Sequence, residues 1–398
     1  MENGFSTPNG INISNNNKSN GSLSQQKEFK NNENNNKNIE TGNEVTPSGK
    51  NCNTSIITAF TFPSDNPPLI ILLNKGNTTY MNSCIECLVN IKDISLHYLN
   101  NLNIIKDSLN NMPISYTFSR IIFHLFPNPK LSYQKIYSVE TFHKTITFLN
   151  PLFNGKKTKD AIDFLIYFIN VLNEDDKFIQ NNKNKYDKNL EKNKNSIIFE
   201  TFSWQSKKTE ICLECKKETT KIQNYFTFDL EFQNGFSKTI LNKKNEISII
   251  DCLKYTLESN KIYNLFCQKC DMKKVFEKKS YILSSQKYLI LLLREINNQD
   301  DEMIQKLRKN NIEIKIDEIL DLSSLIIDQS QRNIYRINGV IFYDPEEKEY
   351  EAFSVNPINN KWYYYKKDDS IKSCELKHFN NKDYLKKKYP VILFYKRD

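Results

Sequence analysis

Two Cys-x-x-Cys pairs constrain this chain more than any other feature, because they require two distant segments to meet. Cys212 and Cys215 form the first pair, and Cys267 and Cys270 form the second. The two-residue spacing lets one tight turn direct two thiolates toward one ion, and two such turns complete a tetrahedral shell of four sulfurs. A closed shell of this kind is typical of structural Zn²⁺, which stabilises a fold without performing catalysis. The sequence therefore predicts a zinc site, with chance pairs of buried cysteines or a redox pair as the alternatives.

The remaining cysteines indicate the compartment. The chain has nine cysteines, an odd number, and those outside the two pairs are scattered along it. This pattern favours a metal site in a reducing compartment over a disulfide framework, so we expect the protein in the cytoplasm or the nucleus. No apolar stretch is long enough to span a membrane, and the N-terminus lacks the apolar core of a secretory signal.

Hydrophobic periodicity separates a helical first part from a strand-rich second part. Helical spacing predicts helices at 83–91, 114–126, 139–149 and 160–172, and again at 249–258. Period-two alternation or short apolar runs predict strands at 199–204, 225–232, 281–293, 334–343, 350–355 and 391–395. Helices followed by strands indicate an α+β fold and argue against an alternating βαβ sheet.

Two polar segments interrupt this order. Residues 1–55 consist mainly of Asn, Ser, Lys and Gly, and cannot bury enough apolar surface to offset the entropy of ordering, which predicts disorder. Residues 176–195 are also polar and indicate a flexible insertion. The formal charge of +9 comes from scattered lysines. A solvated surface explains this charge better than nucleic acid or an anionic membrane, since no basic stretch interleaves aromatic residues suited to base stacking.

The segment 74–83 reads N-K-G-N-T-T-Y-M-N-S. It resembles the Cys box of the ubiquitin-specific proteases (ubiquitin carboxyl-terminal hydrolases), N-x-G-N-T-C-Y-M-N-S. Further segments resemble other blocks of that family and follow in its order, from about Leu69 to the C-terminus. They lie at 159–165, 211–215, 226–230, 248–253, 263–267, 289–294 and 392–395.

The resemblance implies a papain-like cysteine protease fold in the form of a hand. A helical thumb corresponds to about 69–175, zinc-bearing fingers to 196–280 and a β-rich palm to 281–398, all within a domain spanning 56–398. In the family this hand grips ubiquitin, whose tail passes between thumb and palm.

Carried over by position, the family's catalytic residues are replaced. Thr79 stands at the nucleophile, and a threonine hydroxyl does not form the reactive anion that a thiolate provides. The family's G-H-Y-x-A matches 348–352, which places Glu349 at the base. The orienting acid corresponds to Lys366, or to Asp368 after a local shift. Asn74 is retained at the oxyanion position, although it also suits a turn. The chain's histidines, His97, His124, His143 and His378, all lie elsewhere.

These replacements predict a pseudo-deubiquitinase that binds ubiquitin, a ubiquitinated protein or a protein complex without hydrolysis. Lys348 replaces the glycine that leaves room for the diglycine tail, and the acidic residues around it fit an ordinary solvated hairpin better than a docking site. One alternative is an active deubiquitinase that hydrolyses ubiquitin C-terminal (iso)peptide bonds with Cys84 or Cys87 and Asp368. Another is a basic scaffold that binds RNA or a protein complex. Neither nucleic acid nor a membrane is the favoured partner.

Overall fold

The computed structural model describes Phe62, Pro67 and residues 69–126, 135–155, 157–186, 195–296, 301–366 and 370–398. The chain divides into two compact units, Met1–Ile57 and Thr58–Asp398, and all described residues belong to the second. The segment 1–55, for which the sequence predicts disorder, lies outside the described residues. Within the described part, no helix combines the length and the apolar character needed to cross a membrane.

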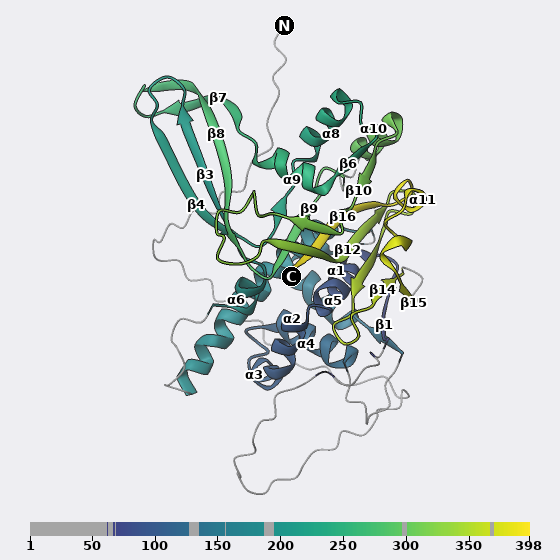
Figure 1. Cartoon of the computed structure of the whole chain (residues 1–398). Helices are drawn as coiled ribbons and strands as arrows, with labels where there is room; N and C mark the ends of the chain where they lie inside the picture. Colours follow the sequence, from purple (N-terminus) through teal and green to yellow (C-terminus); the bar gives the residue numbers. More distant parts are fainter. Residues whose placement is uncertain are drawn as a thin grey trace, which may run out of the picture. The chain divides into compact units, whose positions relative to one another are not determined.

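The first part of the described chain is helical (Figure 1, purple to teal). Its helices are α1 (Thr79–Val89), α2 (Lys92–Asn100), α3 (Leu102–Asp107), α4 (Pro113–Leu125), α5 (Glu140–Leu149), the 3-10 helix η1 (Pro151–Phe153), α6 (Ala161–Tyr186) and α7 (Ile197–Phe202). Strands β1 (Ile71–Leu73) and β2 (Ile136–Ser138) form a parallel pair beside them.

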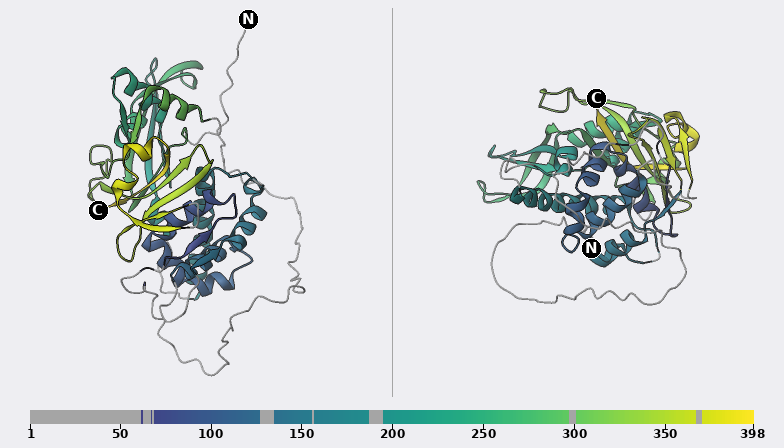
Figure 2. Two further views of the ribbon diagram at one scale, coloured as in Figure 1. Left: turned by 90° about the vertical axis from the view of Figure 1, so that its right-hand side faces the viewer. Right: turned by 90° about the horizontal axis from the view of Figure 1, so that it is seen from below.

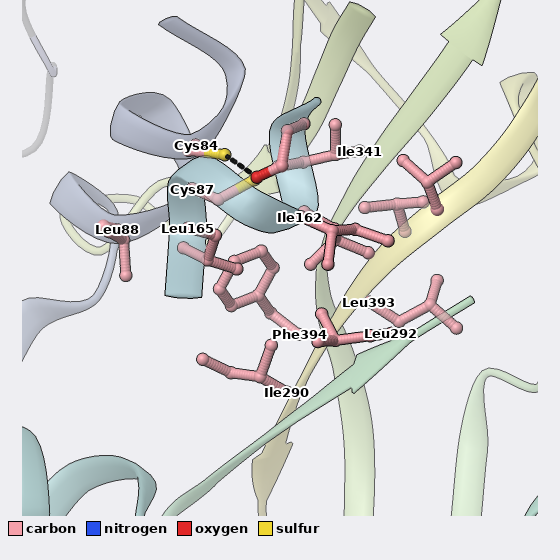
Figure 3. Packing of buried hydrophobic residues seen from close by; sticks show 14 of the residues in the cluster. Cys84, Cys87, Leu88, Ile162, Leu165, Ile290, Leu292, Ile341, Leu393 and Phe394 are labelled. Atoms are coloured by element: carbon pink, nitrogen blue, oxygen red, sulfur yellow. Dashed lines mark hydrogen bonds between the residues drawn. The ribbon is translucent and has the colours of Figure 1, made fainter. Parts of the chain in front are cut away.

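Helix α1 is buried along its whole length. Glu86 is its only charged residue, which is the composition expected of a helix surrounded by other elements. The helix packs between α6 and the strands β12 (Ile334–Asp344) and β13 (Glu349–Val355), and Figure 3 shows Cys84 and Cys87 close to Ile162. The close packing of β12 on α1 is visible at Gly339, where a Cβ would lie in van der Waals contact, 3.4 Å from the Cys87 sulfur.

An eight-stranded sheet forms the centre of the second part. Its path runs β15-β14-β13-β12-β16-β9-β5, and β11 pairs with β12. Figure 2 shows the first helices lying on one side of this sheet. The side chain of Phe342, on β12, packs against the rings of Phe379 and Tyr384, which follow β15 in the chain. The strands other than β12 and β13 are β5 (Phe228–Asp229), β9 (Tyr288–Leu292), β11 (Ile319–Asp321), β14 (Trp362–Tyr365), β15 (Ile371–Cys374) and β16 (Tyr389–Arg397).

A four-stranded antiparallel sheet carries the cysteine pairs at one end. Its order is β4-β3-β8-β7. The strands are β3 (Trp204–Cys212), β4 (Glu218–Tyr225), β7 (Asn260–Cys267) and β8 (Met272–Ser285). Most side chains of β4 and β7 are exposed, so this sheet has little core of its own and depends on another source of stability.

Smaller elements complete the described chain. Strands β6 (Glu246–Ser248) and β10 (Glu313–Lys315) form a second parallel pair. The remaining helices are α8 (Phe232–Leu241), α9 (Ile249–Leu257), α10 (Glu302–Asn310), the 3-10 helix η2 (Leu376–His378) and α11 (Lys382–Leu385). Helices and sheets occur in the order that the sequence predicts, and the α+β prediction is confirmed.

Three local predictions are corrected. The expected strand 199–204 is mostly helix α7, because the Ser196 side chain caps the helix by accepting a hydrogen bond from the Phe199 N–H at 3.0 Å. The expected strand 225–232 is the end of β4, the short β5 and the start of α8. Residues 176–186 are helical rather than part of a flexible insertion, because Ile179 continues the buried stripe of α6. Residues 187–194 lie outside the described part.

Candidate functional site

The turn before α1 is organised by Asn74. Its side-chain oxygen accepts hydrogen bonds from the Gly76 N–H at 3.1 Å, the Thr78 N–H at 3.4 Å and the Thr78 hydroxyl at 3.1 Å. Gly76 has φ of +84°, a conformation that glycine adopts without a steric penalty. The retained Asn74 and Gly76 therefore have a structural role here that does not require catalysis.

Thr79 is the first residue of α1 and is 3% exposed. Its hydroxyl oxygen accepts a hydrogen bond from the backbone N–H of Tyr350 at 3.2 Å. This bond joins the start of α1 to β13, the strand on which the sequence places the family's base. The structure therefore places Thr79 against the strand that begins at Glu349.

The base position lies at the start of β13. Glu349 is half-buried and immediately precedes Tyr350. Lys348, in the turn between β12 and β13, is exposed and has φ of +56°. A left-handed backbone at this residue explains why glycine suits the position, since a side chain is strained there.

A small cavity of about 30 Å³ adjoins Thr79. Among its lining residues are Asn74, Tyr350, Tyr365 and Lys366. The structure thus places Asn74, Thr79 and Lys366 around one space that is large enough for a water molecule and too small for a further side chain. Asp368, the alternative position for the orienting acid, lies outside the described residues.

The four histidines of the described chain lie away from the Thr79 cavity and make other contacts. His97 lies 2.5 Å from the buried carboxylate of Asp176, and His124 stacks on Tyr137 at a ring-centroid distance of 4.4 Å. His143 lies on α5, and His378 contacts the backbone of Glu375. Among the described residues that line the cavity beside Thr79, none is a histidine.

Cys84 and Cys87 belong to the core beneath Thr79. They are 0% and 2% exposed, and the Cys84 thiol donates a hydrogen bond to the Ala161 carbonyl at 3.4 Å (Figure 3). Burial raises the pKa of both thiols well above the ordinary value. A neutral, buried thiol is a poor nucleophile, because the thiolate is the reactive form.

Sequence reasoning missed Glu86, which lies two turns after Thr79 on α1. It is 5% exposed and lines both the cavity beside Thr79 and a neighbouring one of about 20 Å³. Burial raises the pKa of its carboxyl group well above the ordinary value, which favours the neutral acid. The signal in the sequence was a single charged residue inside an otherwise uncharged helix.

The two cysteine pairs converge at the end of the four-stranded sheet. The sulfurs of Cys212, Cys215, Cys267 and Cys270 all lie within 4.8 Å of one another. Cys212 and Cys270 are 4.0 Å apart, and Cys215 and Cys267 are 3.5 Å apart. Four sulfurs bound at about 2.3 Å around a tetrahedral ion lie about 3.8 Å apart, so the arrangement fits a metal such as zinc.

The two pairs also share one backbone geometry. The residue after the second cysteine of each pair, Lys216 or Asp271, has positive φ, at 58° and 53° respectively. Each pair is therefore a similar tight turn that aims both thiols inward. This confirms the prediction of four cysteines positioned to bind a metal ion.

A helical part, a central sheet and a sheet ending in four clustered cysteines define the class of the ubiquitin-specific proteases. The family model for ubiquitin carboxyl-terminal hydrolase matches residues 71–395. This chain belongs to the ubiquitin carboxyl-terminal hydrolase family.

Relatives in this family share modest identity with the chain. Ubiquitin carboxyl-terminal hydrolase 25 of Arabidopsis thaliana is 24% identical over 318 residues, which cover 75% of this chain and 44% of the relative. Ubiquitin carboxyl-terminal hydrolase 12 of Saccharomyces cerevisiae is 32% identical over 113 residues, which cover 26% of this chain and 9% of the relative. The chain thus spans less than half the length of either relative.

Solved structures show the same fold. A chain of the SAGA DUB module Ubp8/Sgf11/Sus1/Sgf73 bound to monoubiquitin has a TM-score of 0.61 and 16% identity, over 86% of this chain and 73% of that chain. The same module bound to ubiquitin aldehyde gives a TM-score of 0.58 and 18% identity, over 83% and 70%. The predicted hand of thumb, fingers and palm is confirmed, with α1 in the thumb, the four-stranded sheet as the fingers and the eight-stranded sheet in the palm.

Proposed function

We propose that this protein is a pseudo-deubiquitinase, a member of the ubiquitin system that binds ubiquitin or a ubiquitinated partner without cleaving it. We further propose that Zn²⁺ occupies the four-cysteine site as a structural ion, and that the protein works in the cytoplasm or the nucleus. The two parts of the proposal depend on different regions of the molecule, the Thr79 cavity and the fingers.

The observation that carries the first part is the environment of the Thr79 hydroxyl. Attack on a carbonyl carbon requires that the hydroxyl lose its proton to a nearby base. Here the hydroxyl oxygen accepts a bond from the Tyr350 N–H, and no histidine lines the adjoining cavity within the described chain. Glu349 at the base position precedes Tyr350, and Glu349 is not among the lining residues. The arrangement supports a hydroxyl used as a structural acceptor between helix and strand.

The thiols of α1 offer no substitute nucleophile. Cys84 and Cys87 are enclosed by the core, and their raised pKa values keep them protonated at neutral pH. Their reaction with a ubiquitin tail requires that α1 separate from β12 and α6. The buried positions therefore weigh against an active deubiquitinase with displaced catalytic residues.

Ubiquitin binding is supported by the fold that the chain shares with the ubiquitin-bound modules described above. Fingers and palm are retained, and the four cysteines are in place to hold the fingers. Zinc bound there replaces the hydrophobic core that the four-stranded sheet lacks, because a closed four-thiolate shell contributes directly to folding. A partner within a protein complex is proposed on the same basis.

Two measurements on the purified chain test the proposal. Titration with monoubiquitin in a calorimeter should give a saturable heat, and a fluorogenic ubiquitin substrate should show no turnover above that of a Thr79→Ala variant. Turnover that is lost in Thr79→Ala contradicts the pseudoenzyme. The absence of any heat at high micromolar ubiquitin contradicts ubiquitin binding. The remaining proposal is then that the domain binds a partner other than ubiquitin.

A further inference from the structure

A cavity of about 220 Å³ lies on the thumb, between α4 and the start of α5. It is lined by Tyr116, Thr117, Arg120, Ile121, Tyr137, Ser138, Val139, Thr141 and Phe142. None of the residues that line the Thr79 cavity is among them. This space is about seven times larger than the cavity beside Thr79, and it plays no part in the proposed function.

One positive charge in this cavity has no acidic partner among the residues that the structure describes. Arg120 is the only charged residue among those that line it, and within the described chain no carboxylate lies at ion-pair distance from its guanidinium. Glu140, which lies in the sequence between the lining residues Val139 and Thr141, is bound to Lys144 at 2.7 Å and lies 3.8 Å from Lys75. Arg120 is exposed, so its charge is available to a ligand.

Hydrogen-bonding groups surround that charge. The Tyr137 phenol lies beside Arg120, and burial raises the pKa of the phenol while the guanidinium acts in the opposite direction. Exposed Ser138 at the end of β2 and exposed Thr141 in the first turn of α5 bring further hydroxyl groups. Burial and then Arg120 lower the pKa of the neighbouring His124, so that its ring is neutral near pH 7. Arg120 is then the single charge among the described residues at this cavity.

We propose that this thumb cavity binds a phosphoryl group, with Arg120 pairing with the phosphoryl oxygens and the phenol of Tyr137 donating to them. A guanidinium presents two parallel N–H donors that match two oxygens of a phosphoryl group. Hydroxyl groups supply donors to the remaining oxygen. The rings of Tyr116, Tyr137 and Phe142 form a wall on which the organic part of the ligand packs.

The phosphoryl group can belong to a phosphorylated side chain of a partner or to free inorganic phosphate. Titration of the full chain with phenyl phosphate and, separately, with inorganic phosphate distinguishes the two by calorimetry or by NMR shifts. Tighter binding of phenyl phosphate than of inorganic phosphate indicates that the natural ligand is a phosphorylated side chain, because only phenyl phosphate contacts the aromatic wall. Equal affinity for the two probes indicates that the natural ligand is free phosphate.

Two arginine variants make the test specific. Arg120→Gln should weaken phenyl phosphate binding by about tenfold or more, because a charge-assisted hydrogen bond is lost. Arg332→Gln, which removes an exposed arginine that does not line this cavity, should bind as the unaltered protein does. Unchanged melting temperatures confirm that both variants fold. The proposal is overturned if neither probe binds saturably, if Arg120→Gln binds as tightly as the original, or if both variants lose binding equally.

Discussion

The hydroxyl oxygen of Thr79 lies 3.2 Å from the backbone nitrogen of Tyr350 and accepts its hydrogen bond. This contact joins the first residue of α1 to the strand that bears Glu349 at the position of the family's base. The two residues that the resemblance predicts at the nucleophile and base positions, Thr79 and Glu349, therefore lie on elements that are directly hydrogen-bonded to each other. Thr79 now stabilises the junction between thumb and palm.

Restoring the reactive groups should restore reactivity in steps. Thr79→Cys alone should react slowly with a cysteine-directed ubiquitin probe, because no base lowers the pKa of the new thiol. Adding Glu349→His should accelerate the reaction by about 10²-fold, the lower end of the contribution of a positioned acid-base group. Gel-shift kinetics measure both rates, with Thr79→Ala as the unlabelled control. Equal rates for the single and double variants contradict the placement of Glu349 at the base position.

Glu86 should make the protein less stable as the pH rises. The folded-state pKa of this carboxyl lies above its unfolded value, so its contribution is fully present below about pH 4.5 and is lost as the pH rises toward the folded-state pKa. Glu86→Gln removes that dependence and should be more stable than the original at pH 8, by roughly 1–3 kcal/mol, the usual cost of a buried group without a good partner.

Urea unfolding of both proteins from pH 5 to pH 8 measures the difference. Asp160, whose pKa burial raises to about 6, titrates in the same range, but its contribution cancels between the two proteins. A gap in free energy of unfolding that stays constant with pH contradicts a buried neutral Glu86.

The four-cysteine site should hold one zinc ion, and its loss should loosen the fingers. Cys212→Ser removes one thiolate from the shell and should lower both the zinc content, measured by mass spectrometry, and the melting temperature, by roughly 5 °C or more. Cys374→Ser is the matched control, because Cys374 is half-buried and lies outside the cluster. Purified protein that contains no metal, or variants with equal melting temperatures, contradicts a structural zinc.

Lys348 should be a site of local strain. Its φ of +56° is costly for any residue with a Cβ, so Lys348→Gly should raise the free energy of unfolding by about 1 kcal/mol. Lys348→Ala keeps the Cβ and should give no such gain, although it removes the same charge. Equal effects of the two variants on urea unfolding indicate that charge rather than backbone conformation decides stability at this turn.

Much of the metal site could be predicted from the sequence, because the ligand spacing is itself a local geometry. Cys212 and Cys215 already form one turn, and only the contact with the second pair required the fold. The α+β order also followed from periodicity. Helix α7 was predicted as a strand because the alternation of apolar residues takes no account of the helix cap that Ser196 supplies. The end of α6 was predicted as a flexible insertion because its exposed face gives the segment a polar composition.

The candidate site was less accessible to sequence reasoning. The position of Thr79 could be assigned from its motif, but its bond to Tyr350 joins residues 271 positions apart and depends on how α1 packs on β13. Glu86 shows the same limit. A carboxylate in an uncharged helix is conspicuous, yet only the packed structure shows that it is buried beside the Thr79 cavity.

Hydrolysis of a fluorogenic ubiquitin substrate tests the central proposal most directly. The full chain, loaded with zinc and present at micromolar concentration, is compared with Thr79→Ala and with a substrate blank over several hours. The proposed pseudoenzyme predicts that all three progress curves have the same slope. A faster curve for the original protein that falls to the blank in Thr79→Ala contradicts it and makes the Thr79 hydroxyl a working nucleophile.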